Sequence, residues 1–229
     1  MKILLIAGHG QGDSGATGCG YKEADLTREV VSLVKPKLSA YATVEVADTS
    51  VNWFNNKAKL PLSNVDYVLE IHFNACVNDT KGNGATTGTE IYVTTSENGT
   101  GVEENIVNGI ATLGLKNRGV KRKNWAVINY CKNKGVSSAL LETCFIDDAD
   151  DMKIYTAKKE AIADAITNGI VAGFGLKKTI DELTEACNTL ATAGIINSPD
   201  YWAKGSGYSD ENTVLLLKKF AKYVRGGIG

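Results

Sequence analysis

The sequence Lys2-Ile3-Leu4-Leu5-Ile6-Ala7-Gly8-His9-Gly10 opens the chain and decides how the rest of it is interpreted. Its unbroken apolar run is typical of a short buried strand, which ends in a histidine between two glycines. The glycine-rich segment 8–21 predicts a loop. Apolar residues at helical spacing then predict a helix over 23–41, in which Pro36 favours a kink or an early end.

Strand and helix patterns keep alternating along the next part of the chain. We expect further strands over residues 43–46, 65–72, 88–95 and 137–142, and helices over 102–113 and 155–174. The acidic turn 147–151 is expected to start the second of these helices, and residues 120–130 to be extended, whereas 48–60 fit neither pattern. This alternation predicts an α/β fold with a twisted, mostly parallel sheet flanked by helices.

A domain boundary is expected at Lys177-Lys178, so that residues 1–176 form the larger domain and 179–229 a small all-helical appendage. The appendage predicts helices over 180–193 and 212–224, joined by a loop over 194–207. Its last helix carries an apolar stripe of Val214, Leu215, Leu217, Phe220, Ala221 and Val224. Such a stripe has to be buried against another surface.

The composition excludes several classes of protein. The formal net charge is −1, so no basic field favours nucleic acid, and no apolar run is long enough to predict membrane insertion. The apolar run before Gly8 is too short for a signal peptide, so we expect synthesis in the cytoplasm without one. The five cysteines form no C-x-x-C pair, which argues against a zinc ribbon or a disulfide framework.

The chain has only two histidines, and each lies at the predicted end of a strand. His9 follows the first strand and His72 closes another, Glu142 ends a third strand, and Glu23 opens the first long helix. Sites in α/β sheets gather at the carboxyl ends of strands, and two imidazoles with a carboxylate are a common zinc triad. We therefore interpret His9, Glu23 and His72 as the ligands of one Zn²⁺ per chain, and Glu142 as the general base of a hydrolase.

Each of these residues also has a purely structural interpretation. His9 would only hydrogen-bond a turn, Glu23 would only stabilise a helix N-terminus, and Glu142 would be a surface residue at a strand edge. Spacing and composition alone leave both interpretations open.

Several segments of the chain carry a family resemblance. They are Gly8-His9-Gly10-Gln11-Gly12-Asp13-Ser14-Gly15-Ala16, Glu23, Ile71-His72-Phe73-Asn74-Ala75, Gly88-Thr89-Glu90-Ile91-Tyr92, Arg118-Gly119-Val120-Lys121 and Leu141-Glu142-Thr143-Cys144-Phe145-Ile146. In this order they resemble the motifs of the zinc-dependent N-acetylmuramoyl-L-alanine amidases of the amidase-3 type, found in bacteria and in phage endolysins. The chain departs from the family at Ile6-Ala7, where the usual pair is Asp-Pro and no ligand is involved.

The resemblance implies an α/β domain with zinc held by His9, Glu23 and His72, and Glu142 as catalytic acid/base. The reaction would hydrolyse the amide between N-acetylmuramic acid and L-alanine in bacterial peptidoglycan. With no predicted signal peptide, we expect a phage or prophage endolysin that acts on the cell wall after release from the cytoplasm.

Three further residues are candidates for binding the substrate. Asn74 is two residues past His72 and so faces the same side of an extended segment, where it would contact substrate or cap the strand end. Arg118 and Lys121 belong to the basic run 116–123, which is either a solvated loop or a partner for the carboxylates of the stem peptide.

Two rival functions stay open. A zinc peptidase that cuts within the stem peptide would use the same ligands, and a non-catalytic wall-binding protein would be expected to lack Glu142 or a ligand. The appendage 179–229 is expected to serve wall targeting or self-association through its helices.

Overall fold

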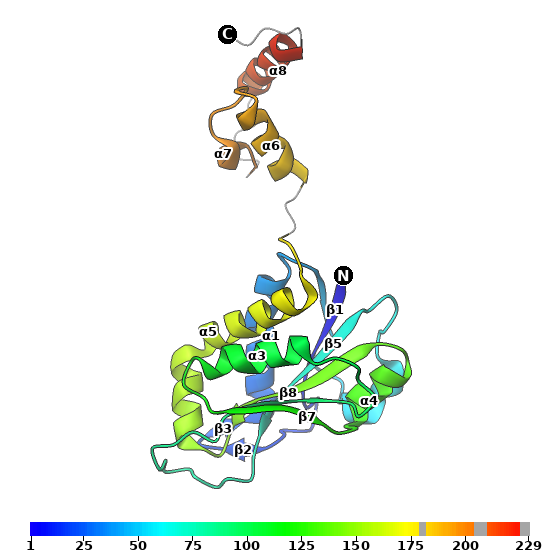
Figure 1. Cartoon of the computed structure of the whole chain (residues 1–229), viewed down its shortest axis with the longest axis vertical. Coiled ribbons are helices and arrows are strands. Elements are labelled where there is room, and N and C mark those ends of the chain that lie inside the picture. The colour runs from blue at the N-terminus through cyan, green and yellow to red at the C-terminus, as the bar shows by residue number, and fades with distance from the viewer. Residues whose placement is uncertain (179–181, 204–209, 225–229) are drawn as a thin grey trace. The chain divides into compact units, whose positions relative to one another are not determined.

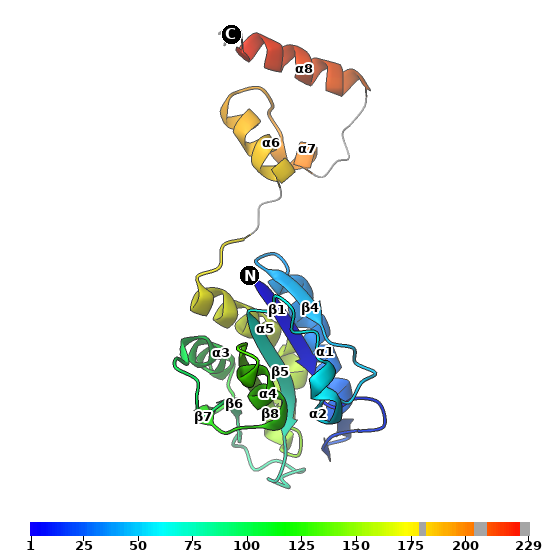
Figure 2. The ribbon, with the colours of Figure 1, turned by 90° about the vertical axis from the view of Figure 1, so that its right-hand side faces the viewer.

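The computed structural model describes residues 1–178, 182–203 and 210–224. Its contacts divide the chain into two compact units, Met1–Lys178 and Thr179–Gly229. The larger unit is a mostly parallel sheet with helices on both faces (Figures 1 and 2), which confirms the expected α/β fold.

The sheet of the larger unit has six strands in the order β4-β1-β5-β8-β6-β7. Their bounds are β1 Lys2–Ala7, β4 Thr43–Val46, β5 Tyr67–Asn74, β6 Thr89–Val93, β7 Asn117–Arg122 and β8 Ser137–Phe145. The first four strands in the sheet order run parallel, and β6 and β7 run the other way. The carboxyl ends of β1, β5 and β8 therefore lie side by side at one edge of the sheet.

Helices cover both faces of this sheet. Their bounds are α1 Glu23–Leu38, α2 Trp53–Asn56, α3 Gly101–Ala111, α4 Ala126–Asn133 and α5 Ala149–Phe174, with a 3₁₀ turn at Lys57–Lys59. Helices α1, α3 and α5 pack on one face, where Figure 1 shows them together, and α2 and α4 pack on the other.

Alternate residues of each strand point to opposite faces of the sheet. In β1, Ile3 and Leu5 enter the core beneath α1, α3 and α5, whereas Leu4 and Ile6 enter the smaller core beneath α2 and α4. The continuous apolar run of β1 thus reflects a strand buried on both faces. The side chains at even positions of β5, including His72, face the α2/α4 side together with Val68.

Several expected elements change in detail. Strand β5 continues to Asn74 and β8 to Phe145, so that His72 and Glu142 lie within strands rather than at their last residues. Helix α1 runs through Pro36 and ends at Leu38. The loop 8–21 contains the first strand of a small hairpin, β2 Thr17–Gly18 and β3 Tyr21–Lys22.

The expectation of an extended segment over 120–130 is wrong beyond Arg122, where β7 ends. Helix α4 begins at Ala126, because Val127, Ile128 and Cys131 recur at helical spacing and are buried against the sheet. The unassigned segment 48–60 also forms helical turns, with Asn52 capping α2 by accepting a hydrogen bond from the backbone N–H of Asn55.

Aspartates at the start of α5 anchor the loop 76–88. Asp147, Asp148, Asp150 and Asp151 all accept hydrogen bonds from its backbone N–H groups. Asp148 is also the N-cap of α5 and accepts from the backbone N–H groups of Asp150 and Asp151. The acidic turn 147–151 therefore starts α5, as expected, and in addition organises a loop.

Three carboxylates of this region, from Asp79, Asp148 and Asp150, lie within 4.8 Å of one another. Both oxygens of Asp148 already accept two hydrogen bonds each, and Asp150 accepts two through one oxygen. These contacts give the cluster a structural function in holding the loop.

The second unit contains α6 Glu182–Thr192, α7 Pro199–Ala203 and α8 Asp210–Val224. Helix α7 lies inside the expected loop 194–207. Residues 204–207 of that loop, and residues 180 and 181 of the first expected helix, lie outside the described part of the chain. Cys187, Ile195 and Ile196 form a small buried core. On α8, Val214, Leu215 and Phe220 are about half exposed, and the side chains of Leu217 and Val224 lie outside the described residues.

None of the described helices combines the length and apolarity that crossing a membrane requires.

We predict that Asp148→Ala lowers the free energy of unfolding by about 1–3 kcal/mol, because it removes a helix cap and leaves the part-buried backbone N–H of Thr87 without its acceptor. Chemical denaturation measures this loss. Asp25→Ala, at an exposed first-turn position of α1, is the control. Equal effects of the two substitutions would contradict the anchoring role of Asp148.

Candidate metal centre

His9 lies just after β1 in a backbone conformation that is unusual for its type, with φ 63°. Helix α1 fixes this turn, since Thr27 Oγ1 donates to the carbonyl of Gly8 and Arg28 donates to the carbonyl of His9. A side chain at Gly8 would place its Cβ only 2.4 Å from the His72 ring. Glycine is therefore required beside His9 for the two imidazoles to approach each other.

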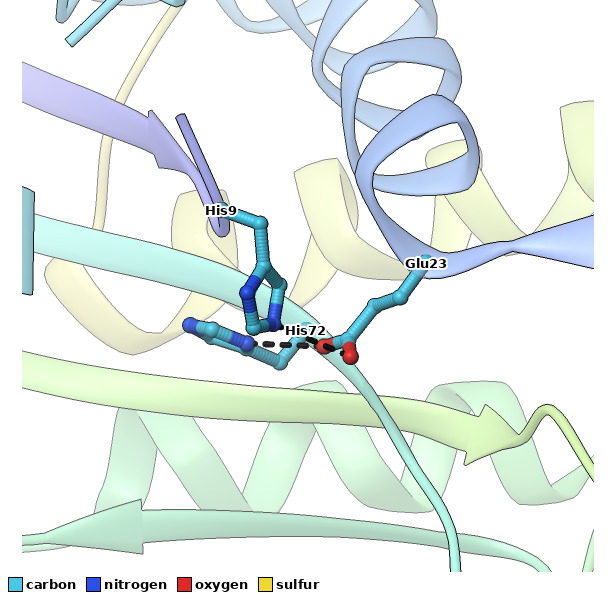
Figure 3. Close-up of side chains that lie close together, drawn as sticks. All are labelled: His9, Glu23 and His72. Carbon is cyan, nitrogen blue, oxygen red and sulfur yellow. Dashed lines mark hydrogen bonds and ion pairs between the residues drawn. The ribbon is translucent and has the colours of Figure 1, made fainter. Parts of the chain in front are cut away.

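Glu23, the first residue of α1, points its carboxylate between the two histidines (Figure 3). Glu23 Oε1 lies 2.8 Å from His72 Nδ1, and Glu23 Oε2 lies 3.0 Å from His9 Nε2. One donor atom from each of the three residues falls within 4.8 Å of the others. Because a tetrahedral zinc site needs its donors roughly 3.3 Å apart, small side-chain movements would fit these three to a metal.

The same carboxylate also satisfies the backbone around it. Glu23 Oε1 accepts the N–H of Phe73 on β5, and Glu23 Oε2 accepts the N–H of Ala16 in the β1–α1 loop. Each oxygen thus has one backbone donor and one imidazole neighbour, and Glu23 is only 4% exposed. The sequence prediction places these three residues together, and the structure shows that Glu23 joins the two segments that carry the histidines.

Charge is balanced within this cluster. Burial would lower the pKa of His72, but the carboxylates of Glu23 and Glu70 outweigh it and raise that pKa well above its usual range. Burial is also outweighed at His9, where Glu23 and Asp13 raise the pKa. Burial would raise the pKa of Glu23, but hydrogen bonds to both imidazoles hold it far below its usual value. Without a metal, these carboxylates favour the protonated form of both histidines.

Each histidine uses its other ring nitrogen to contact a further carboxylate. His9 Nδ1 lies 3.0 Å from Asp13 Oδ2, which also accepts a hydrogen bond from the side chain of Asn52. His72 Nε2 lies 3.3 Å from Glu70 Oε1. Sequence reasoning quoted Asp13 only within a motif and missed Glu70. The signal for Glu70 was its position two residues before His72, which puts both side chains on one face of the strand.

Glu142 lies on β8 directly opposite His72 in the strand register. Burial raises its pKa to about 7, with the His72 charge opposing this and the neighbouring carboxylates adding to it. Glu142 Oε2 is buried and has no hydrogen-bond partner among the described residues. Glu142 is therefore held beside the three candidate ligands, with one buried oxygen free to accept a proton.

The four residues line one cleft of about 530 Å³ at the carboxyl edge of the sheet. Two exposed aromatic side chains, Phe54 on α2 and Trp125 before α4, belong to its wall. No sequence pattern singled them out, because α2 and α4 were not recognised as helices.

The three proposed substrate-binding residues meet at a buried carboxylate, Glu90, which is 1% exposed. Glu90 accepts hydrogen bonds from Arg118, Lys121 and Asn74. Burial would raise its pKa, but Lys121 and Arg118 hold it below its usual value. Glu90 also pairs with Glu142 across neighbouring strands, so this cluster adjoins the candidate metal centre.

The structure excludes one of the two interpretations of the basic run 116–123. The run is not a solvated loop, since residues 117–122 form the edge strand β7. Cations on an edge strand discourage pairing with other chains. Asn74 donates to Glu90 and accepts from the backbone N–H of Ala75. Substrate binding by Asn74, Arg118 and Lys121 stays a prediction.

Comparison with known proteins agrees with the motif resemblance. Residues 3–172 match the N-acetylmuramoyl-L-alanine amidase family. The chain is 34% identical over 180 residues to the N-acetylmuramoyl-L-alanine amidase LytC of Bacillus subtilis (strain 168). The aligned region covers 74% of this chain but only 35% of LytC. It is 30% identical over 191 residues to the endolysin of Bacillus phage SPP1, and the aligned region covers 77% of this chain and 67% of the endolysin. The chain therefore belongs to the N-acetylmuramoyl-L-alanine amidase family.

A solved structure shows the same fold. The crystal structure of an N-acetylmuramoyl-L-alanine amidase from Clostridium difficile 630 matches with a TM-score of 0.64 and 22% identity, over 76% of this chain and 96% of that one.

We predict that metal binding to the metal-free protein releases protons at pH 7. The pKa values of His9 and His72 are raised in the metal-free state, and a metal takes only their unprotonated nitrogens. The apparent affinity should therefore fall as pH is lowered, and proton release should shrink as pH rises through these raised pKa values. Zinc titration by calorimetry in buffers of different ionisation enthalpy measures this, and a heat independent of the buffer at pH 7 would contradict it.

Proposed function

We propose that this protein is a zinc-dependent N-acetylmuramoyl-L-alanine amidase that degrades bacterial peptidoglycan. One observation carries the proposal: His9, Glu23 and His72 converge in a cleft where Glu142 keeps a buried oxygen free, in a chain that belongs to this family. The bond cleaved would be the amide between N-acetylmuramic acid and L-alanine.

The three converging residues suit zinc. Two imidazole nitrogens and one carboxylate oxygen are a donor set that zinc uses in hydrolases, whereas magnesium and calcium prefer oxygen donors throughout. When bound, zinc supplies Lewis-acid chemistry, polarising the scissile carbonyl and acidifying a water molecule. One ion per chain follows from one such set, and we infer the identity of the metal from its chemistry.

Glu142 would carry the proton in this reaction. It takes a proton from the attacking water and delivers it to the nitrogen of the leaving amine, which departs as L-alanine of the stem peptide. Burial and its carboxylate neighbours give Glu142 a pKa of about 7 in the metal-free state, so that its two protonation states are close in energy. A group poised in this way suits both halves of the transfer.

The cleft and the Glu90 cluster beside it offer two surfaces for the two sides of the scissile bond. Arg118 and Lys121 provide two cations against the single charge of Glu90, an excess of positive charge suited to the carboxylates of the acidic stem peptide. Phe54 is 64% exposed and Trp125 37% exposed, and aromatic faces of this kind stack on sugar rings. We assign the peptide to the first surface and the glycan to the second.

The principal rival is a zinc peptidase that cuts within the stem peptide. Digestion of purified peptidoglycan followed by mass spectrometry separates the two. The amidase should release intact stem peptides that begin with a free L-alanine amine, and leave N-acetylmuramic acid with a free lactyl carboxyl group. Fragments in which L-alanine stays attached to the sugar would contradict the proposal.

A non-catalytic wall-binding protein is the other rival. Such a protein has no need for a carboxylate with a buried, unpartnered oxygen beside a set of metal donors, and Glu142 is one among the described residues. The relative named endolysin, from Bacillus phage SPP1, supports an endolysin role in which the protein acts on the cell wall after leaving the cytoplasm.

We predict that Glu142→Gln retains zinc but lowers the turnover number by about 10²-fold or more, because it removes the proton acceptor and leaves the ligands in place. Glu23→Gln and His72→Ala are expected to lose both metal and activity. Metal content by elemental analysis and turnover on soluble muropeptide are the two measurements. Zinc retained in Glu23→Gln and lost in Glu142→Gln would show that ligand and base are exchanged.

We propose that the second unit targets the wall or associates with another copy of itself. Residues 1–178 contain the whole candidate site and form their own compact unit. A truncation after Lys178 should therefore keep zinc and cleave soluble muropeptide, yet lyse whole cells less well than the full chain. Equal lysis by both forms, with no change in association state by light scattering, would leave the unit without either role.

A further inference from the structure

A second buried carboxylate, Glu70, lies in the floor of the cleft and has no part in the proposed reaction. Its side chain is only 7% exposed, and it lines the same cavity as His72 and Glu142. It stands on β5 two residues before His72, so both side chains point to the α2/α4 face. Placing a carboxylate at such depth is costly unless it makes a specific contact.

The contact that Glu70 makes is with His72. Glu70 Oε1 lies 3.3 Å from His72 Nε2, on the side of the ring away from Glu23. Glu70 Oε2 is buried and has no hydrogen-bond partner among the described residues. Among the described residues, the ion pair of this carboxylate is with the ring of a proposed zinc ligand.

This contact has a consequence for the proton on the ring. A neutral imidazole carries its proton on one nitrogen and a lone pair on the other. A carboxylate accepts a proton-bearing nitrogen and repels a lone pair, so Glu70 favours a proton on Nε2 of His72, as Glu23 favours one on Nδ1 in the metal-free site. When a metal displaces the Nδ1 proton, Glu70 keeps the remaining proton on Nε2 and leaves the lone pair on Nδ1, the nitrogen that faces Glu23.

We propose that Glu70 is a positioning residue that selects the Nε2-protonated form of His72 and so presents Nδ1 to the metal. This inference rests on the proposed function, since it requires a metal at His9, Glu23 and His72. Glu70 acts on the metal through the His72 ring, whose second nitrogen it contacts. Carboxylates that hold the second nitrogen of a ligating histidine orient the ring and make it a stronger ligand.

The other histidine provides an internal comparison, because its nitrogens have the opposite functions. His9 directs Nε2 to Glu23 and Nδ1 to Asp13. Asp13 is 40% exposed, whereas Glu70 is 7% exposed. Charge interactions are weaker at the exposed contact, since solvent screens them. Loss of Glu70 should therefore weaken metal binding more than loss of Asp13.

The test compares Glu70→Ala, Glu70→Gln and Asp13→Ala by zinc affinity, measured with a competing chelator. Glu70→Ala should raise the dissociation constant by about 10- to 100-fold. Glu70→Gln retains an oxygen that can accept a hydrogen bond from Nε2–H of His72, so this variant should lose clearly less zinc affinity. Glu103→Gln is the control, because Glu103 is also a buried carboxylate, bonded to Tyr67, and it is not among the residues that line the cleft. Thermal unfolding of the metal-free variants checks that each one folds.

Nitrogen-15 NMR reads the protonation of the ring directly, and a chain with 2 histidines gives only two ring systems to assign. In the zinc-loaded protein, His72 should carry its proton on Nε2 and His9 on Nδ1. A proton on Nδ1 of His72, or equal losses of affinity in Glu70→Ala and Glu70→Gln, would overturn the positioning role. If the protein binds zinc and gives either of these results, the positioning role of Glu70 is wrong and the amidase proposal stands. If the unaltered protein binds no zinc, both the positioning role and the amidase proposal are contradicted.

Discussion

The buried carboxylate of Glu23 is the group on which the rest of the site depends. Each of its oxygens accepts one backbone N–H and faces one imidazole, so a single side chain joins the β1–α1 loop, α1 and β5. A charged group at 4% exposure is stable only with such partners. The glycines around it follow from the same constraint, because a Cβ at Gly15 would come within 2.7 Å of Glu23 Oε2.

Much of this arrangement could be predicted from the sequence, because the topology of a parallel sheet brings strand ends together. His9 and His72 followed apolar runs, and β1 and β5 are neighbours in the sheet. Helix α4 was missed because Trp125, Val127 and Ile128 suit a strand equally well until Cys131 is counted with them. Glu70 and Glu90 were missed as interacting residues because their partners depend on strand register, which periodicity does not give.

Three glutamates on one face of the sheet illustrate how surroundings divide functions among identical side chains. Glu142 keeps a free oxygen, and burial raises its pKa to about 7. Glu90 is held ionised by Arg118 and Lys121, and Glu70 contacts the ring of His72. We propose proton transfer for the first, organisation of the two cations for the second, and orientation of a candidate ligand for the third.

The central claim is that the three side chains gathered by Glu23 hold the metal. Anomalous diffraction at the zinc absorption edge, from crystals of the zinc-loaded protein, tests it most directly, because the described residues contain a second group of carboxylates at Asp79, Asp148 and Asp150. The account predicts one strong peak between His9 Nε2, the Glu23 carboxylate and His72 Nδ1. A principal peak at the aspartate cluster, or none at the histidines, would contradict it.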